Sequence, residues 1–534
     1  MQSDPATNRA GRPWLLLALG ALAAGCAAAM VVALTPWGIN TSPDSSLYVG
    51  GARSLLDEGR LWMPFGYGGP APLTHFPPLY PAALAAADAV GGELAQAARW
   101  LHAALFALNV VLAGVAARRY APGSRLAPVL AMLLAAASLD LLYVHVMAWS
   151  EPLYLAASTA GFVVLAGFVR ARSRRALLLA AAAIGAAWVT RYVGAAAVAA
   201  GVMGILLLGR GPARTRLRDA LAFGAAASLP MALWIARNLL VAERATNRDV
   251  RFHPVDAAKL REAYATAADW VLPAWLPGRG MLFALAAAAV AGGAGWMLRR
   301  AYARARAGGS AADGLPVILA LYAAAYLALL LVSITLFDRT TPLDFRILSP
   351  LLFALIPILA CTLAEALRVR TEDRRKRIAA LAFAAIAAVV AANAVQRTAS
   401  WVARYGGDGQ VYGHANWRTS PLLGAARGLP PGVRIHSNLP EAVYLLAGRT
   451  GYLVPRRVDA LSGAANPRFA AELTAIGGEP AAGPRFVVYF EGIGRPHLAT
   501  EAELARALRL RRIGAYRDGR LYEVVGAAGA GGGP

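Results

Sequence analysis

The stretch WLLLALGALAAGCAAAMVVALT, residues 14–35, contains no charged side chain. A helix that crosses a membrane needs about 20 mostly apolar residues, so this stretch predicts a membrane span. The chain is 58% hydrophobic and only 16% charged, which excludes a soluble enzyme, a disordered chain and a small disulfide scaffold. We therefore expect an α-helical polytopic membrane protein with about 11 transmembrane helices. The other apolar runs are 98–117, 126–147, 152–169, 176–190, 192–209, 219–241, 280–298, 315–336, 347–367 and 378–396.

Many of the basic residues cluster in short loops between these runs. Lys and Arg number 53 against 30 Asp and Glu, which gives a formal net charge of +23. Basic residues concentrate in the cytoplasmic loops of membrane proteins, so these loops predict the cytoplasmic side and argue against a nucleic-acid partner. The N-terminus is then cytoplasmic and the C-terminus extracytoplasmic. The heavy use of Ala, Gly and Arg is typical of a GC-rich bacterial genome, so we expect the cytoplasmic membrane of a bacterium. The basic loops are 118–125, 170–175, 210–218, 299–306 and 368–377.

Two long segments fall on the predicted outer side. The first outer loop covers 36–97, and the region 397–534 follows the last apolar run. We therefore divide the chain into a transmembrane domain, 1–396, and a small extracytoplasmic α/β domain, 397–534, with a flexible Gly-rich tail at 526–534. In this domain we expect strands at 433–437 and 486–490, helices at 441–446 and 501–508, and a hairpin turn at 517–520.

Sequence motifs of several common chemistries are missing. The chain has no Walker loop, no His-Glu-x-x-His, no Cys-x-x-Cys and no Gly-x-Ser-x-Gly. A nucleotide-driven function therefore has no support. A transporter or lipid flippase, and a non-catalytic membrane scaffold acting through 397–534, stay open as alternatives. Transporters often show paired halves, and we find no such repeat here.

Polar and aromatic residues cluster in the first outer loop. Leu47, Ala52, Leu55 and Leu56 recur at helical spacing, which predicts an amphipathic helix lying on the membrane. Asp44 stands just before this helix, and taken alone such an Asp is typical of a helix N-cap.

Several short motifs follow one another on the predicted outer side. They are Asp44-x-x-x-Tyr48, His75-Phe76-Pro77-Pro78-Leu79-Tyr80-Pro81, Ser150-Glu151-Pro152-Leu153-Tyr154, Thr190-Arg191-Tyr192-Val193-Gly194 and Pro342-Leu343-Asp344-Phe345-Arg346-Ile347-Leu348-Ser349-Pro350. In order and spacing they resemble the GT-C superfamily of membrane glycosyltransferases, especially its bacterial protein O-mannosyltransferase-like and aminoarabinose-transferase-like members. The resemblance covers 10–400.

This resemblance implies an inverting glycosyltransferase, which moves a sugar from a polyprenyl-phosphate carrier to a lipid, glycan or protein acceptor on the outer face of the membrane. Asp44 matches the family's catalytic acidic residue, and a carboxylate within hydrogen-bond reach can take the proton of an acceptor hydroxyl. Many relatives carry a second acidic residue where this chain has Ser45. We therefore assign no metal ligand or cofactor, and the use of a divalent metal stays open.

The lipid phosphate that leaves the sugar must have its charge stabilised, and the planar fork of arginine suits phosphate oxygens. Arg191, between two short apolar runs, and Arg346 are our candidates for binding the donor phosphate, together with His75. The alternatives are a snorkelling or ion-paired Arg191, an ion pair of Arg346 with Asp338 or Asp344, and a loop histidine without a ligand.

Three further residues are candidates for binding substrate. Tyr48 and Tyr80 offer rings that stack on a sugar or isoprenoid, whereas aromatic residues at this depth are commonly interface anchors. Glu151 offers a carboxylate to sugar hydroxyls, or it stabilises the start of the helix that follows it.

Overall fold

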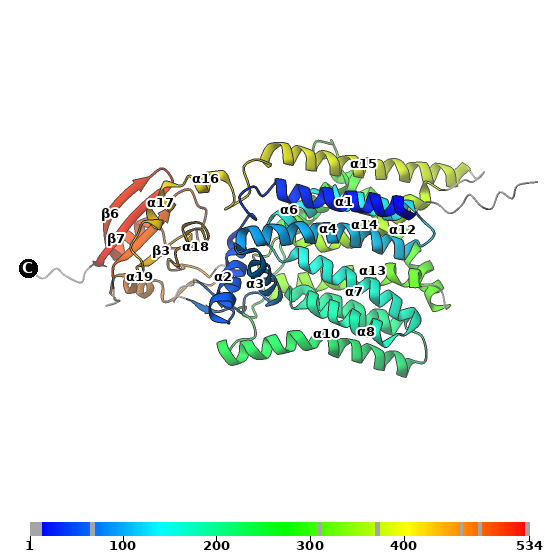
Figure 1. The fold of residues 1–534 in the computed structure, drawn as a ribbon, viewed down its shortest axis with the longest axis horizontal. Coiled ribbons are helices and arrows are strands. Elements are labelled where there is room, and N and C mark those ends of the chain that lie inside the picture. Colours follow the sequence, from blue (N-terminus) through cyan, green and yellow to red (C-terminus); the bar gives the residue numbers. More distant parts are fainter. Residues whose placement is uncertain are drawn as a thin grey trace, which may run out of the picture.

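The computed structural model describes residues 13–64, 70–307, 311–368, 374–459, 463–478 and 483–528. Long helices form a bundle, and a small sheet with its own helices lies beyond one end of that bundle (Figure 1). The helices of the bundle and its loops are α1 (Pro13–Ala33), α2 (Pro43–Glu58), α3 (Leu79–Gly91), α4 (Leu94–Tyr120), α5 (Leu126–Ala136), α6 (Leu139–Val146), α7 (Glu151–Ala171), α8 (Arg174–Trp188), the short turn η2 (Tyr192–Gly194), α9 (Ala195–Leu208), α10 (Ala213–Ala242), α11 (Ala257–Val271), α12 (Arg279–Arg306), α13 (Ala311–Leu336), α14 (Phe345–Ala366) and α15 (Arg374–Tyr405).

Helices occupy every apolar run that the sequence singles out, and the chain is a multi-pass helical membrane protein. The described part of the chain has 5 helices long and apolar enough to span a membrane, namely α4, α7, α10, α13 and α14. The pair α5 and α6, bent by 56°, makes a sixth if it counts as one span. The predicted count of about 11 is therefore not confirmed. Other apolar helices, such as Leu17–Ala33 and Tyr192–Leu208, are only 10–17 residues long.

Small residues let the helices of the bundle approach closely. A Cβ atom on Gly161 of α7 would lie 2.5 Å from Ile184 of α8, and one on Gly201 of α9 would lie 2.4 Å from the ring of Phe223 of α10. Close approach at small residues gives membrane helices their packing contacts, because lipid supplies no hydrophobic drive for helices to associate. The frequent Ala and Gly of this chain therefore build its core.

The first outer loop contains the predicted helix, α2, followed by a short hairpin, β1 (Trp62–Met63) with β2 (Ala71–Pro72), and by α3. Ser42 is the N-cap of α2, and it forms a capping box with Ser45. Asp44 therefore lies inside the first turn of α2, so an N-cap role for Asp44 is wrong. Figure 1 shows α2 and α3 between the bundle and the sheet.

The C-terminal region contains a small sheet with helices, as the sequence predicts, although α15 continues to Tyr405, past the predicted boundary at 397. Its five strands lie in the order β4-β3-β5-β7-β6, with β3 parallel to both neighbours and β7 antiparallel to both of its own. The expected strands, helices and hairpin turn are confirmed. The predicted start of the flexible tail at 526 is wrong, because 526 and 527 pair with β6 as the end of β7, and 529–534 lie outside the described residues. The elements are α16 (Ala415–Arg418), α17 (Pro421–Arg427), β3 (Arg434–Ser437), α18 (Pro440–Ala447), β4 (Gly451–Leu453), α19 (Phe469–Gly478), β5 (Arg485–Phe490), α20 (Glu501–Ala507), β6 (Leu508–Tyr516) and β7 (Gly519–Ala527).

One asparagine joins this unit to the bundle. Asn40 donates through Nδ2 to the carbonyl of Val146 at 3.0 Å and accepts at Oδ1 from the amide of Gln410 at 2.9 Å. Next to it, the amide of Tyr412 donates to the carbonyl of Thr41 at 3.0 Å. The start of the first outer loop is therefore held between the end of α6 and the segment before α16.

Candidate functional site

Arg346 connects two carboxylates that are far apart in the sequence. It lies in the first turn of α14, where the N-cap Asp344 accepts from the amides of Arg346 and Ile347. Its Nη1 donates to Asp44 Oδ2 at 2.6 Å, and its Nε donates to Glu151 Oε1 at 2.6 Å. Arg346 is therefore ion-paired, with Asp44 and Glu151 as its partners, while Asp344 caps the helix and Asp338 pairs with Arg248.

Arg191 reaches the same carboxylate from the break between α8 and α9. Its Nη1 lies 2.5 Å from Glu151 Oε1 and donates to Ser150 Oγ at 3.1 Å. Glu151 is the first residue of α7 and its side chain is fully buried, so its charge depends on these two arginines. Glu151 Oε2 and Arg191 Nε have no hydrogen-bond partner among the described residues. A buried network that is incompletely satisfied has polar atoms to offer a ligand.

Tyr48 lies one turn after Asp44 on α2. Its hydroxyl is 3.0 Å from Ser150 Oγ, and its ring stacks on Phe76 at 4.3 Å and meets the edge of Tyr80 at 4.9 Å. The structure places Tyr80 behind Tyr48, where its hydroxyl is 2.6 Å from His102 Nε2. Tyr80 thus packs against Tyr48, and it is not among the residues that line the cavity bordered by Asp44, Arg191 and Arg346.

Two titratable groups of the first outer loop, Asp44 and His75, have shifted pKa values that decide their charge at neutral pH. Burial raises the pKa of the Asp44 carboxyl, but Arg346, His75 and Arg191 outweigh burial and hold that pKa below its ordinary value of 3.8. Burial and the nearby Arg248 lower the pKa of His75 below its ordinary value of 6.5. At neutral pH Asp44 is therefore a carboxylate and His75 is neutral. The His75 ring nitrogen Nδ1 contacts the side-chain amide of Asn247.

These residues surround a cavity of about 640 Å³. One wall is polar, and it carries Asp44, Tyr48, His75, Arg191 and Arg346. The facing wall is apolar, and its members are Leu329, Leu330, Val332, Phe337 and Ile347. Such a cavity suits an amphiphile, because the few polar groups orient the ligand while the apolar surface buries its chain.

Sequence reasoning missed several residues of this cavity. Arg248 and Asp338 form an ion pair at 3.3 Å, and Tyr326 of α13 also lines the cavity. The Arg346 guanidinium lies 4.0 Å above the ring of Trp149. Arg248 carried a usable signal, since an arginine in a predicted outer loop opposes the bias toward cytoplasmic loops. Nothing in the local pattern pointed to Tyr326.

The carboxylates around the cavity do not fit a resident divalent cation. Asp44 and Glu151 are held by arginines, Asp338 pairs with Arg248, and Asp344 caps α14. Hard cations need several oxygen ligands that are free of such partners. In the ranges that the structure describes, no three His, Cys, Asp or Glu residues gather as metal ligands do.

Comparisons with known proteins identify the fold. No protein-family model matches the chain, and no curated protein matches it. Its structure is similar to that of ArnT from Cupriavidus metallidurans bound to undecaprenyl phosphate, with a TM-score of 0.55 at 15% identity over 96% of this chain and 97% of that chain. It is also similar to the Archaeoglobus fulgidus oligosaccharyltransferase in complex with Zn and sulfate, with a TM-score of 0.50 at 15% identity over 80% and 62% of the two chains. The chain therefore shares the fold of these proteins.

Proposed function

We propose that this chain, which has the GT-C fold, is an inverting glycosyltransferase that moves a sugar from a polyprenyl-phosphate carrier to an acceptor at the outer face of a bacterial cytoplasmic membrane. One observation carries the proposal: an ionised carboxylate, Asp44, faces an amphiphilic cavity beside two arginines. The fold alone does not specify an activity, whereas this arrangement of side chains suits a reaction.

Asp44 is the proposed base. As the acceptor oxygen attacks C1 of the sugar, its proton passes to the Asp44 carboxylate. The bond between C1 and the phosphate oxygen breaks, and its electron pair leaves with the polyprenyl phosphate. Attack opposite to the leaving group inverts the configuration at C1. The low pKa of Asp44 supports this role because it keeps the carboxylate free of a proton at neutral pH.

The arginines are the proposed partners of the phosphate. Arg346 forms ion pairs through Nε and Nη1, and we assign its Nη2 to a phosphate oxygen. Arg191 adds a second positive charge, and a neutral His75 is a further hydrogen-bonding group beside the phosphate. Charge that develops on the leaving phosphate is stabilised most by donors that are already in position. Glu151 is then the group that holds both arginines in place, and Tyr48 is the proposed ring for the sugar.

The apolar wall supports a lipid carrier. Leu329, Leu330 and Phe337 face the cavity from α13 and the loop that follows it. ArnT, which shares this fold, has been crystallised with undecaprenyl phosphate. A transporter or a scaffold needs no base beside such a wall, so the catalytic function is favoured over both alternatives.

The same geometry supports the proposed orientation. The helices α7 and α14 carry Glu151 and Arg346 in their first turns, whereas Arg170 lies in the last turn of α7 and Arg368 lies just after α14. Figure 1 shows the sheet beyond the first ends. If basic loops mark the cytoplasm, the candidate site and an extracytoplasmic domain formed by 397–534 lie on the outer side.

The proposal is tested with the purified full chain and a panel of polyprenyl-phosphate sugars, with a lipid and glycan extract of the source organism as the acceptor pool. We expect release of polyprenyl phosphate from at least one donor, and a product whose anomeric configuration, read by NMR, is opposite to that of the donor. Transfer with retained configuration contradicts the inverting mechanism. Passage of a lipid across proteoliposomes with no covalent transfer contradicts the enzyme proposal and favours a flippase.

A further inference from the structure

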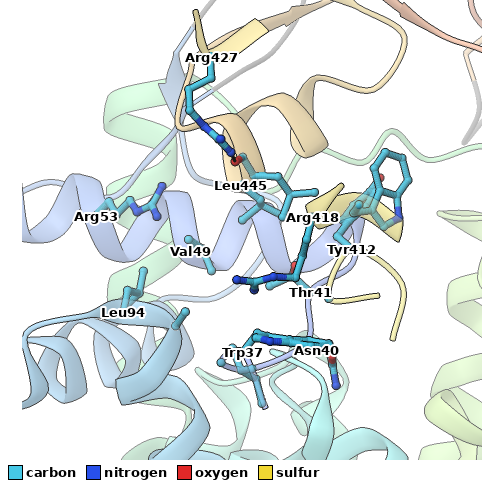
Figure 2. Close-up of a pocket in the computed structure, with 16 residues that line it drawn as sticks. Trp37, Asn40, Thr41, Val49, Arg53, Leu94, Tyr412, Arg418, Arg427 and Leu445 are labelled. Carbon is cyan, nitrogen blue, oxygen red and sulfur yellow. Dashed lines mark hydrogen bonds between the residues drawn. The ribbon is translucent and has the colours of Figure 1, made fainter. Parts of the chain in front are cut away.

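A second cavity, of about 400 Å³, lies between the bundle and the α/β unit. The segment that begins the first outer loop, the helix α2 and the start of α4 form one side, and residues of α16, α17 and α18 form the other. Figure 2 shows the side chains that line it. It is separate from the cavity that holds Asp44, and the proposed function assigns nothing to it. We call it the arginine cavity.

Three arginines from three elements line this cavity. Arg53 comes from α2, Arg418 from α16 and Arg427 from α17 (Figure 2). The lining contains no Asp or Glu, and none of the three arginines pairs with a carboxylate anywhere in the described ranges. Arg53 is half-buried, and Arg418 and Arg427 are exposed, whereas the half-buried Arg346 is matched by Asp44. An unmatched group of like charges favours a bound anion, because an anion removes their mutual repulsion.

The contacts of two of these arginines leave several of their donors available. The Arg418 guanidinium lies 5.1 Å from the centre of the Trp37 ring, and the Arg53 guanidinium lies 5.1 Å from that of Tyr444. Stacking on a ring orients a guanidinium without using up its N–H groups. Arg53 also forms a side-chain hydrogen bond with Tyr444, and a guanidinium has five N–H groups, so other donors of Arg53 are left for a ligand. Arg427 differs, since it donates to the carbonyl of Leu446 at 2.9 Å. Arg53 and Arg418 are therefore the pair best placed to bind an anion.

Helix α2 is a wall shared by the two cavities. Asp44 and Tyr48 line the cavity that holds Asp44, while Val49 and Arg53 line the arginine cavity. Each pair is separated by one helical turn, so two faces of a single helix serve two cavities. Thr41, just before α2, also lines the arginine cavity. A molecule bound there lies next to the helix that carries the proposed base.

We propose that the arginine cavity binds a phosphate or carboxylate group of the acceptor, so that the acceptor is an anionic glycolipid or saccharide. The identification of the bound molecule as the acceptor rests on the proposed function, whereas anion binding by this cavity does not. Arginine forks bind phosphate and carboxylate through paired hydrogen bonds. The exposed ring of Trp37, 40% accessible, gives a sugar a flat surface beside them.

The test measures anion binding with no sugar donor present. Calorimetry with glucosamine 1-phosphate reports a soluble anion, and native mass spectrometry with dioleoyl phosphatidic acid reports a lipid-anchored one. Glucosamine and dioleoylglycerol are the uncharged controls. The variant R53Q/R418Q removes the charges of both of these arginines. The matched variant R509Q/R512Q removes the same charge from exposed positions on β6.

We expect wild type and R509Q/R512Q to bind an anionic probe, and R53Q/R418Q to bind it at least about tenfold more weakly. The probe that binds, soluble or lipid-anchored, identifies the source of the anion. Equal binding by all three proteins places the anion elsewhere and overturns the proposal, as does the absence of binding to every anionic probe. Anion binding by a protein that releases no polyprenyl phosphate contradicts the proposed function alone, so the two failures are distinguishable.

Discussion

At the scale of single residues, Arg346 sets the ionisation of the proposed base. Burial alone raises the pKa of Asp44, and the attraction and hydrogen bond of Arg346 are the largest influences that lower it. A carboxylate acts as a base only when it has lost its proton, so this pair extends activity toward acid pH. Arg346 also contacts Glu151 and Trp149, which fix its position.

The first prediction concerns pH. In R346Q burial prevails, the pKa of Asp44 rises, and the loss of kcat/KM on acidification moves to a pH about 1–3 units higher than in wild type. The overall rate falls as well, so the position of the acid limb is the diagnostic quantity. R60Q, which removes an exposed arginine paired with Glu58, serves as the control. An acid limb that stays in place in R346Q would mean that Asp44 is not the titrating base.

The second prediction concerns stability. Glu151 is fully buried between Arg191 and Arg346, and E151Q leaves both cations without a full countercharge. Breaking a buried pair from one side costs about 3–5 kcal/mol, so we expect a clear drop in the thermal unfolding temperature in detergent. E58Q removes an exposed partner of Arg60 and should shift stability by no more than about 1 kcal/mol. Similar unfolding temperatures for E151Q and E58Q would contradict the buried network.

The sequence predicted which residues lie together, but it did not predict which of them form pairs. Asp44, Tyr48, His75, Arg191 and Arg346 all line one cavity, as their shared side of the membrane led us to expect. Their pairings were not predictable, because most of them join residues more than a hundred positions apart and the pair of Arg191 with Glu151 crosses between helices. The site roles themselves stay predictions.

At the scale of elements, the break between α8 and α9 brings Arg191 into the site. A Cβ atom on Gly194 would lie 2.4 Å from Trp188 Cα and 2.8 Å from its amide nitrogen. Both are backbone atoms that have no room to move, so only glycine permits this break. Residues 192–194 form the short turn η2 there in place of a continuous helix.

The third prediction tests this break. G194A forces the two helices apart, displaces Arg191 from Glu151, and lowers both the unfolding temperature and the rate of polyprenyl phosphate release. Overpacking of this kind costs about 1–3 kcal/mol. G25A is the control, since a Cβ atom at this helical position of α1 meets nothing within 4 Å. Unchanged stability in G194A would show that the break does not need glycine.

The apolar runs predicted where helices form, but they did not predict where those helices bend. The break at Thr190-Arg191-Tyr192 was visible as a charge between two short runs. The 56° bend between α5 and α6 had no such signal, because no proline or glycine lies in 126–146 apart from Pro128 near its start. Ser138 caps α6 by accepting from the amide of Leu141, and this local hydrogen bond competes with a continuous helix.

At the scale of the whole molecule, the α/β unit is held to the bundle through Asn40. Its side chain bonds to backbone groups of α6 and of the segment before α16, and no pattern within either region predicts that meeting. The unit therefore covers the arginine cavity from a defined position. The multi-pass helical class was predictable from composition, because lipid imposes the same constraint on every span, while the fold shared with ArnT was suggested only by the order and spacing of the motifs.

The fourth prediction tests this junction. N40A removes three hydrogen bonds, to Leu34, Val146 and Gln410, and should speed hydrogen exchange in residues 406–415 by about fivefold or more. N416A changes an exposed side chain on α16 and should leave exchange in this segment unchanged. Equal exchange in N40A and wild type would mean that other contacts hold the unit in place.

The central claim is that Asp44 takes the proton of the acceptor. Its most direct test compares D44N with D57N, which removes another acid from the same helix, α2, at an exposed position. Both variants are supplied with the donor that wild type uses, and release of polyprenyl phosphate is followed. We predict that D44N unfolds at a temperature close to that of wild type and loses about a hundredfold or more in kcat, while D57N keeps the wild-type rate. A folded D44N with wild-type kcat would contradict the account.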